Sequence, residues 1–221
     1  MQQKGLPEEY KRGHMEFLGC KINLSARPLI PRPETEFWTA QAIDDLAKLN
    51  RKVRVLDIFS GSGCVGIAVA KKIPAAKIDF ADIDQNAVKQ IKINLKINSI
   101  KSSRAKVFRS DIFKEISANH SYDAILANPP YVDPAKITQV QKSVIDHEPR
   151  TALFGGKRGM EVIEKFLARA QKFLKPNGFI YMEFDPRQRK DIMKLIRDEK
   201  YSSFEFFKDQ FRRWRFVKII R

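Results

Sequence analysis

The fold class of this chain is decided by the stretch Asp57-Ile58-Phe59-Ser60-Gly61-Ser62-Gly63-Cys64-Val65-Gly66. It connects a segment with the composition of a buried strand, Arg51–Ile58, to a helical pattern over Cys64–Lys72. Its glycines follow the pattern G-x-G-x-x-G, which lets a backbone turn approach a ligand closely, and the N–H groups that begin the helix are free to bind it. The stretch therefore predicts a nucleotide-binding loop between a strand and a helix.

Strand and helix patterns alternate along the rest of the chain. Further strands are expected at Lys77–Asp82, Ala105–Arg109, Tyr122–Ala127 and Gly178–Phe184, and helices at Glu34–Leu49, Gln85–Asn98, Met160–Leu174 and Arg187–Glu199. The last two strands, Ser203–Lys208 and Arg213–Ile220, are expected to form a C-terminal β-hairpin. The alternation predicts an α/β fold with a doubly wound, mostly parallel sheet, whose ligands bind beyond the carboxyl ends of the strands. Residues 1–33 are expected to form an extended arm before a single domain, 34–221.

Three acidic residues near the glycine loop narrow the choice of ligand. Asp82 ends the second predicted strand, 19 residues after Gly63, where a carboxylate can accept hydrogen bonds from ribose hydroxyls. This arrangement fits a dinucleotide as well as S-adenosylmethionine. The other two acids favour S-adenosylmethionine: Asp57 can hold a charged amino group or turn the loop, and Asp111 can accept from an adenine amino group while Ile112 covers the ring. A plain capping role is the alternative for Asp111.

The strongest chemical signal is the turn Asn128-Pro129-Pro130-Tyr131, directly after an apolar strand. Two prolines fix the chain and remove two N–H donors, so that acceptors dominate the turn. The Asn128 side-chain oxygen and the Pro129 carbonyl can both accept from one planar NH₂ group, on whose face Tyr131 can stack. Such a site orients the weakly nucleophilic nitrogen of an amide or exocyclic amine toward a sulfonium methyl group, with no metal and no covalent intermediate. All four residues are candidate catalytic residues.

Composition limits the class of protein. The chain has 42 Lys and Arg against 26 Asp and Glu, a net charge of +16 that favours polyanionic partners or surroundings such as the ribosome or nucleic acid. The basic residues are mostly dispersed, and the densest run, at residues 208–221, is either a closing strand or a contact surface for RNA or an acidic protein.

Two cysteines and three histidines argue against a disulfide scaffold or a zinc site. No apolar run reaches the ~18 residues of a membrane span, and the N-terminus lacks a signal-peptide pattern, so a cytoplasmic protein without a membrane partner is expected.

The chain resembles the glutamine-N5 methyltransferases that modify peptide chain release factors, the HemK/PrmC family. The Asn128–Tyr131 turn is shared with methyltransferases that act on amino groups of DNA and RNA. More specific to this family are Leu29-Ile30-Pro31-Arg32-Pro33-Glu34-Thr35-Glu36, the segment His147-Glu148-Pro149-Arg150-Thr151-Ala152-Leu153 with Gly155, Gly156 and Gly159, and Glu183 with Gln188.

The resemblance implies a seven-stranded, Rossmann-like class I methyltransferase domain. It implies S-adenosylmethionine as cofactor, S-adenosylhomocysteine as product, and the glutamine of a release factor's Gly-Gly-Gln motif as substrate. Together with Asp57, the expected cofactor-binding residues are Phe59, Ser60, Gly61, Ser62, Gly63, Asp82, Asp111, Ile112 and Asn128. The expected substrate-binding residues are Arg32, Pro33, Glu34, Asn128, Pro129, Pro130 and Tyr131. For the arm at 32–36 the alternative is ordinary helix-start chemistry.

Alternatives and departures from the family pattern accompany this hypothesis. The second functional hypothesis is a nucleic-acid methyltransferase acting on adenine N6 or guanine N2, and the third is a nicotinamide enzyme or a binding module without catalysis. Phe59 stands where the family has the first glycine of its loop, and Glu183 is followed by Phe184 where the family has glycine. The helical domain that precedes the methyltransferase domain in this family has no counterpart in these 221 residues.

Overall fold

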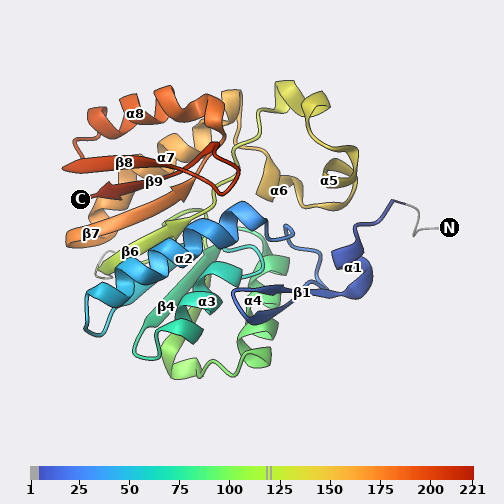
Figure 1. Ribbon diagram of the computed structural model, residues 1–221, viewed down its shortest axis with the longest axis horizontal. Coiled ribbons are helices and arrows are strands. Elements are labelled where there is room, and N and C mark those ends of the chain that lie inside the picture. Colours follow the sequence, from blue (N-terminus) through green and yellow to red (C-terminus); the bar gives the residue numbers. More distant parts are fainter. Residues whose placement is uncertain (1–4, 118, 120) are drawn as a thin grey trace.

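The computed structural model describes residues 5–117, 119 and 121–221 (Figure 1). Seven strands form one sheet in the order β5-β4-β3-β6-β7-β9-β8. They span β3 Arg54–Ile58, β4 Lys77–Asp82, β5 Ala105–Arg109, β6 Tyr122–Ala127, β7 Leu174–Glu183, β8 Ser203–Lys208 and β9 Trp214–Ile220. Strands β3 to β7 pair in parallel, and β9 is antiparallel to both β7 and β8. The predicted doubly wound, mostly parallel sheet with a C-terminal hairpin is confirmed.

The strand order reverses between β3 and β6, and this reversal positions the site. The chain runs outward from β3 through β4 to β5 and then returns to the other side of β3. Ile58 pairs with Ala127, and Ala127 pairs with Met182. The residues that follow these three, Phe59, Asn128 and Glu183, therefore leave neighbouring strands at the same carboxyl edge, the usual place for a ligand in such sheets.

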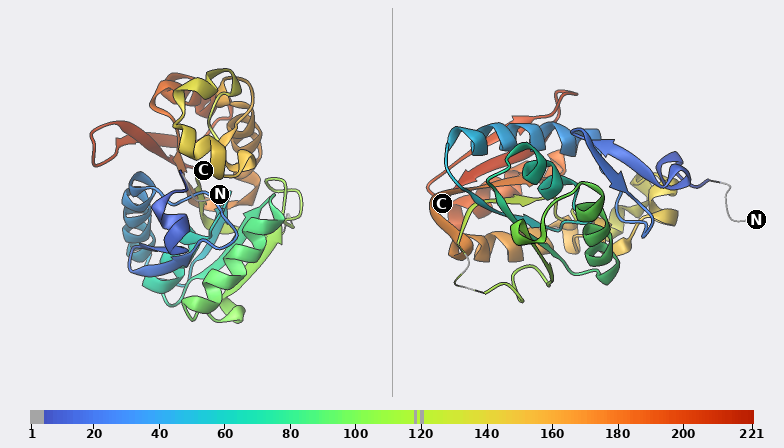
Figure 2. Two further views of the ribbon diagram at one scale, coloured as in Figure 1. Left: turned by 90° about the vertical axis from the view of Figure 1, so that its right-hand side faces the viewer. Right: turned by 90° about the horizontal axis from the view of Figure 1, so that it is seen from below.

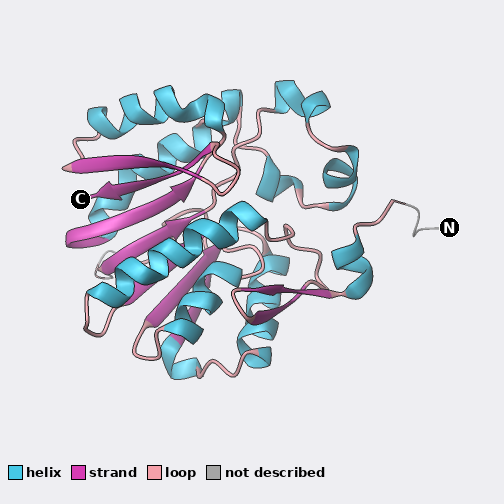
Figure 3. Ribbon diagram, viewed as in Figure 1, coloured by secondary structure: helices cyan, strands magenta, loops and turns pink. Residues whose placement is uncertain are grey.

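Helices cover both faces of the sheet (Figures 2 and 3). One face carries α2 Pro33–Lys48, α3 Cys64–Lys72 and α4 Gln85–Ile97, and the other carries α7 Glu161–Ala170 and α8 Arg189–Asp198. Alternate residues of β3 pack into the two cores, Val55 with the first helix group and Leu56 with the second. Because β3 is buried on both sides, its sequence is apolar throughout most of its length rather than alternating.

The N-terminal segment differs from the extended arm expected for residues 1–33. It forms α1 Glu8–Arg12 and a hairpin of β1 His14–Phe17 with β2 Cys20–Asn23, and residues 1–4 lie outside the described part. Three amides spaced four residues apart on α4 bind its backbone: Gln90, Asn94 and Asn98 accept from the N–H groups of Ala26, Asn23 and Lys21. This polar stripe, which lies on the buried face of α4, explains why the segment folds against the helix. The domain boundary at residue 34 stays a prediction.

The connection from β6 to β7 contains helices that the sequence did not predict. Between the turn at Asn128–Tyr131 and α7 lie α5 Lys142–His147 and α6 Arg150–Leu153, with 3₁₀ turns at Pro134–Gln139 and Lys157–Gly159. Further 3₁₀ turns lie at Ser102–Arg104, Gln171–Phe173 and Pro186–Gln188. Strand β7 begins at Leu174, four residues before the expected start, because α7 gives way to the turn at Gln171–Phe173. Within the described residues, no helix combines the length and the apolar character that crossing a membrane requires.

Candidate active site

A first cavity of about 280 Å³ opens beyond the carboxyl ends of β3, β4 and β6. Nine of the ten predicted cofactor-binding residues line it: Asp57, Phe59, Ser60, Gly61, Ser62, Asp82, Asp111, Ile112 and Asn128. The tenth, Gly63, does not line the cavity; it precedes α3 as its N-cap with φ +79°, a left-handed conformation that glycine adopts without strain. Apolar side chains, among them Ile83 and Ile112, form much of the remaining wall.

Asp82 supports the glycine loop and faces the cavity. One carboxylate oxygen accepts from the Gly61 N–H at 2.8 Å, and the other accepts from the Asp84 N–H at 2.9 Å. Burial raises the pKa of Asp82, against the effect of these two donors. A carboxylate oxygen has more than one lone pair, so each can accept a further hydrogen bond from a diol in the cavity. This donor-poor, acceptor-rich edge beside apolar walls fits the ribose and base of a nucleoside.

Asp57 is the more deeply placed acid. Its carboxylate accepts from the Gly66 N–H in the first turn of α3 at 2.8 Å, and the residue is 3% exposed. Burial raises the pKa of Asp57 well above its ordinary value, and the nearby charge of Asp82 raises it further while the Gly66 N–H lowers it. The contact that the structure shows is the one expected of a residue that turns the loop, although Asp57 also lines the cavity.

Phe59 has a backbone conformation that favours glycine. Its φ is +59°, in the left-handed region. The ring packs edge-on against Phe166 of α7, with the centroids 5.7 Å apart, so the side chain fills space between the loop and the second core. The loop therefore has the shape that close approach to a ligand requires, at the cost of local strain.

A second cavity, of about 570 Å³, lies on the other side of the Asn128–Tyr131 turn. Pro129 and Tyr131 line it, whereas Pro130 lines the first cavity. Asn128 and Arg32 line both cavities. The turn is thus the partition between the two spaces, and Asn128 is a point at which groups from both can meet.

A chain of hydrogen bonds orients the Asn128 amide. Glu183 Oε2 accepts from the Trp38 indole N–H at 2.8 Å and from the Thr35 hydroxyl at 2.6 Å. Because its proton is committed to Glu183, the Thr35 hydroxyl can only accept from Asn128, whose Nδ2 lies 3.2 Å away. No donor among the described residues reaches the Asn128 side-chain oxygen, which is left available as an acceptor.

Glu183 is buried at the centre of this network. It is 1% exposed, and its second oxygen accepts from the Tyr131 hydroxyl at 3.2 Å. Burial raises the pKa of Glu183, while the donors Thr35 and Trp38 and the charge of Arg215 lower it. Burial beside this carboxylate also raises the pKa of Tyr131, which stays a neutral phenol. Glu183 thus ties the two ends of the turn, Asn128 and Tyr131, to α2.

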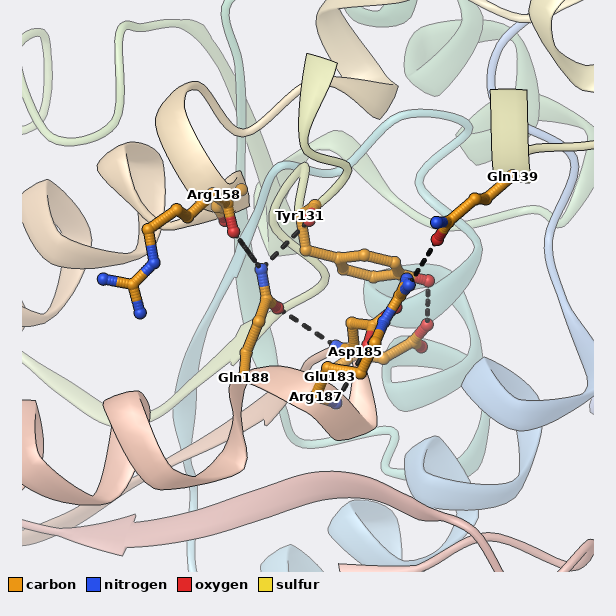
Figure 4. Close-up of polar contacts among 8 residues, drawn as sticks. Tyr131, Gln139, Arg158, Glu183, Asp185, Arg187 and Gln188 are labelled. Atoms are coloured by element: carbon orange, nitrogen blue, oxygen red, sulfur yellow. Dashed lines mark hydrogen bonds and ion pairs between the residues drawn. The ribbon is translucent and has the colours of Figure 1, made fainter. Parts of the chain in front are cut away.

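The turn is held from the opposite side by Gln188 (Figure 4). Its Nε2 donates to the carbonyl oxygens of Tyr131 and Gly159 at 3.0 Å and of Arg158 at 3.2 Å, and its Oε1 accepts from the Asp185 N–H. Gly159 is required for this close packing, since a Cβ there would lie 2.0 Å from the Tyr131 carbonyl oxygen. The backbone of the turn is therefore fixed before any ligand binds.

The predicted substrate-binding residues of the arm divide into two groups. Arg32 lines both cavities and forms an ion pair of 2.6 Å with the buried Glu148 of the α5–α6 connection. Pro33 and Glu34 form the first turn of α2, as helix-start residues do, and are not among the residues that line either cavity. Their role in substrate binding stays a prediction.

The sequence placed Thr35 only as part of the arm at 32–36, and it assigned no role to Trp38 or Arg215. Thr35 stands inside the family-specific segment quoted above, so the signal was present. Trp38 occurs one helical turn later and reads as an ordinary core residue, which it also is: it is fully buried and stacks on Tyr181. Its indole N–H has Glu183 as a partner only because α2 packs across the end of β7, which no local pattern predicts.

Comparisons with known proteins bear on the family of the chain. Residues 39–157 match the family model of the methyltransferase small domain. The chain is 36% identical over 195 residues to a release factor glutamine methyltransferase of Koribacter versatilis, covering 88% of this chain and 68% of that one. The chain belongs to the release factor glutamine methyltransferase family. A second release factor glutamine methyltransferase, from Clostridium acetobutylicum, is 30% identical, and the match covers all of this chain and 77% of that protein. The prediction of a methyltransferase with S-adenosylmethionine as cofactor is confirmed by this membership.

Solved structures share the fold of this family member at low identity. The catalytic domain of hMettl16 matches with a TM-score of 0.72 and 17% identity over 92% of this chain and 76% of that one. A 16S rRNA methyltransferase of Thermus thermophilus, in complex with AdoMet and guanosine, matches with a TM-score of 0.67 and 18% identity. The match covers 94% of this chain and 49% of that one. The Rossmann-like methyltransferase fold is thereby confirmed.

Proposed function

We propose that this protein transfers a methyl group from S-adenosylmethionine to the side-chain amide nitrogen, N5, of the glutamine in the Gly-Gly-Gln motif of a peptide chain release factor. The observation that carries the proposal is the fixed orientation of Asn128 between the two cavities, with its side-chain oxygen free to accept from an amide. The names of the relatives supply the substrate class. The nucleic-acid alternative rests on the same turn and on the net charge of +16, neither of which favours it over the proposal.

The first cavity is suited to S-adenosylmethionine. Asp82 would accept from the ribose hydroxyls, and Asp111 with Ile112 would receive the adenine, since these residues line one wall together with apolar side chains. When bound there, S-adenosylmethionine supplies an electrophilic methyl group. The loop from Phe59 to Ser62 would hold the remainder of the molecule against the N-terminus of α3.

The second cavity would receive the glutamine side chain. Asn128 Oδ1 and the Pro129 carbonyl accept the two N–H bonds of the substrate amide, and Tyr131 packs against its planar face. Two fixed acceptors turn the nitrogen toward the first cavity and stabilise the positive charge that develops on it, without reorganisation during the reaction. No described side chain is assigned as a general base, and solvent in the second cavity takes the released proton.

The substrate and the net charge also suggest where the protein works. A release factor as partner and a charge of +16 are compatible with the vicinity of the ribosome, and we place the protein in the cytoplasm on this ground. The methyltransferase domain is assigned to residues 34–221, with the N-terminal helix and hairpin as a separate element packed on α4.

Tandem mass spectrometry tests the function directly. Recombinant release factor is incubated with the protein and S-adenosylmethionine, and the Gly-Gly-Gln peptide is expected to gain one methyl group on the glutamine. The Asn128→Ala variant is the control; it is expected to retain S-adenosylhomocysteine binding and lose methylation. An unmodified release factor alongside labelled methyl transfer to RNA or DNA would contradict the proposal.

A further inference from the structure

Arg215 lines the second cavity, and apart from lowering the pKa of Glu183 through its charge it has no role assigned to it. It is the second residue of β9, and its carbonyl oxygen accepts from the Phe184 N–H at 2.9 Å, directly after Glu183 on β7. Its guanidinium feels the charges of Glu183, Glu34 and Asp185 and lies near enough to Tyr131 to affect the pKa of that phenol. The side chain is 12% exposed and therefore lies at the same end of the cavity as the Asn128–Tyr131 turn, which is proposed to bind the substrate and is called the substrate turn below.

Among the described residues, only the β8–β9 turn accepts a hydrogen bond from this guanidinium. Arg215 Nε donates to Asp209 Oδ2 at 3.2 Å, and Asp209 is itself 4% exposed. The other oxygen of Asp209 accepts from the N–H groups of Phe211 and Arg213 at 2.9 Å. The turn at 209–213, which projects from the sheet in both views of Figure 2, is thus built around the carboxylate that positions Arg215.

Arg215 differs from the three other arginines of the second cavity. Arg32, Arg158 and Arg187 each direct a terminal nitrogen to a carboxylate, on Glu148, Asp191 and Asp185 respectively. For Arg215, neither terminal nitrogen has a hydrogen-bond partner among the described residues, and neither is sealed from solvent. A guanidinium has five N–H donors, so four of those of Arg215 have no acceptor among the described residues.

We propose that Arg215 binds main-chain carbonyl oxygens of the release-factor loop that carries the methyl-accepting glutamine. This inference rests on the proposed function. A glutamine that follows two glycines has no neighbouring side chains to recognise, so the enzyme has to read the backbone on that side of it. A guanidinium is a donor-only group with a rigid fork, which suits carbonyl acceptors. Asn128 and Pro129 supply acceptors for the amide, and Arg215 supplies the donors for the backbone.

Steady-state methylation with intact recombinant release factor tests the inference through Arg215→Met. The methionine variant cannot donate hydrogen bonds to the bound release factor. Losing hydrogen bonds from a charged donor corresponds to roughly a tenfold or larger rise in KM for the release factor. Since the variant keeps the residues that hold the cofactor and the amide, kcat is expected within about threefold of wild type and the S-adenosylhomocysteine affinity unchanged. Arg215→Lys keeps the positive charge but not the forked set of donors, so its KM for the release factor is expected to lie between those of wild type and Arg215→Met.

Arg213→Met is the matched control, because it removes one positive charge from an exposed position of the same hairpin. Its KM is expected to stay within about twofold of wild type at physiological salt. An equal rise in KM for both variants would overturn the inference in favour of long-range charge, as would a normal KM in Arg215→Met. A fall in melting temperature and in S-adenosylhomocysteine binding with an unchanged KM would assign Arg215 a structural role instead. Failure of wild-type protein to methylate the release factor would refute the proposed function itself.

Discussion

The Thr35 hydroxyl donates to the buried Glu183 carboxylate at 2.6 Å, and this one bond determines that the Asn128 amide directs its nitrogen to Thr35 and leaves its oxygen as the end available to a ligand. Asparagine can present either an acceptor or a donor, and only the acceptor suits an amide substrate. Thr35 comes from the first turn of α2 and Glu183 from the end of β7, 148 residues later. The substrate turn is therefore oriented by residues outside it.

Thr35→Val is expected to lower kcat by about tenfold or more, because valine fills the same space but leaves the Asn128 amide free to rotate. Cofactor binding depends on other residues, so the S-adenosylhomocysteine affinity measured by calorimetry should stay within about threefold. Thr35→Ser retains the hydroxyl and serves as the control. A valine variant with the turnover of wild type would show that Asn128 is oriented by something else.

Asp82→Ala is expected to weaken cofactor binding by about 3 kcal/mol, more than a hundredfold, since the carboxylate would accept two hydrogen bonds from the ribose and also supports the Gly61 N–H. Calorimetry with S-adenosylhomocysteine measures this. Asp44→Ala, on α2 and not among the residues that line the first cavity, provides a control that also removes one negative charge. Equal affinities for the Asp82 variant and wild type would refute the ribose role.

Asp57 is expected to make stability depend on pH. Its native pKa is raised by burial, so the native state holds the proton more tightly than the unfolded chain. Its contribution to the free energy of unfolding is therefore largest below the unfolded pKa of about 3.9 and falls as the pH rises toward the native pKa, by at most about 1.4 kcal/mol per pH unit.

Asp57→Asn removes this titration while keeping an acceptor for the Gly66 N–H. In urea unfolding at a series of pH values from 4 to 8, the stability of the variant relative to wild type is expected to increase with pH. Taking the difference removes the contributions of other carboxyl groups. A relative stability that decreases with pH would mean that the native pKa of Asp57 is lowered.

The sequence predicted the sheet well because strand patterns and the glycine loop are local. It predicted the residues around the first cavity for the same reason: Phe59–Ser62, Asp82 and Asp111 each lie at the end of a strand or just after it, and parallel strands end at one edge. It could not predict the partners of Glu183, which depend on how α2 packs across the sheet. Nor could it predict the hairpin on α4, since Gln90, Asn94 and Asn98 look like a solvated face until backbone groups are placed against them.

Phe59 provides a test of backbone strain in the cofactor loop. Phe59→Ala and Phe59→Gly both lose the contact with Phe166, but only alanine keeps a Cβ in the left-handed conformation. The glycine variant is expected to be about 1 kcal/mol more stable than the alanine variant, the reverse of their usual order. Thermal unfolding of the pair measures the difference, and a more stable alanine variant would show that the loop relaxes to a negative φ.

Gly159 links the stability of the substrate turn to activity. An alanine Cβ would lie 2.0 Å from the Tyr131 carbonyl oxygen and 2.6 Å from Gln188 Nε2, so Gly159→Ala has to displace the turn as well as strain a φ of +70°. Gly19 has a φ of +76° with nothing within 4 Å of its Cβ position, and Gly19→Ala therefore isolates the cost of the backbone conformation, about 1 kcal/mol. Gly159→Ala is expected to cost at least about 2 kcal/mol more than this control and to lower kcat, because Asn128 and Tyr131 move with the turn. Urea unfolding and methylation assays on the two variants measure both effects. Equal stabilities with wild-type turnover would mean that the segment at 157–159 yields without moving the turn.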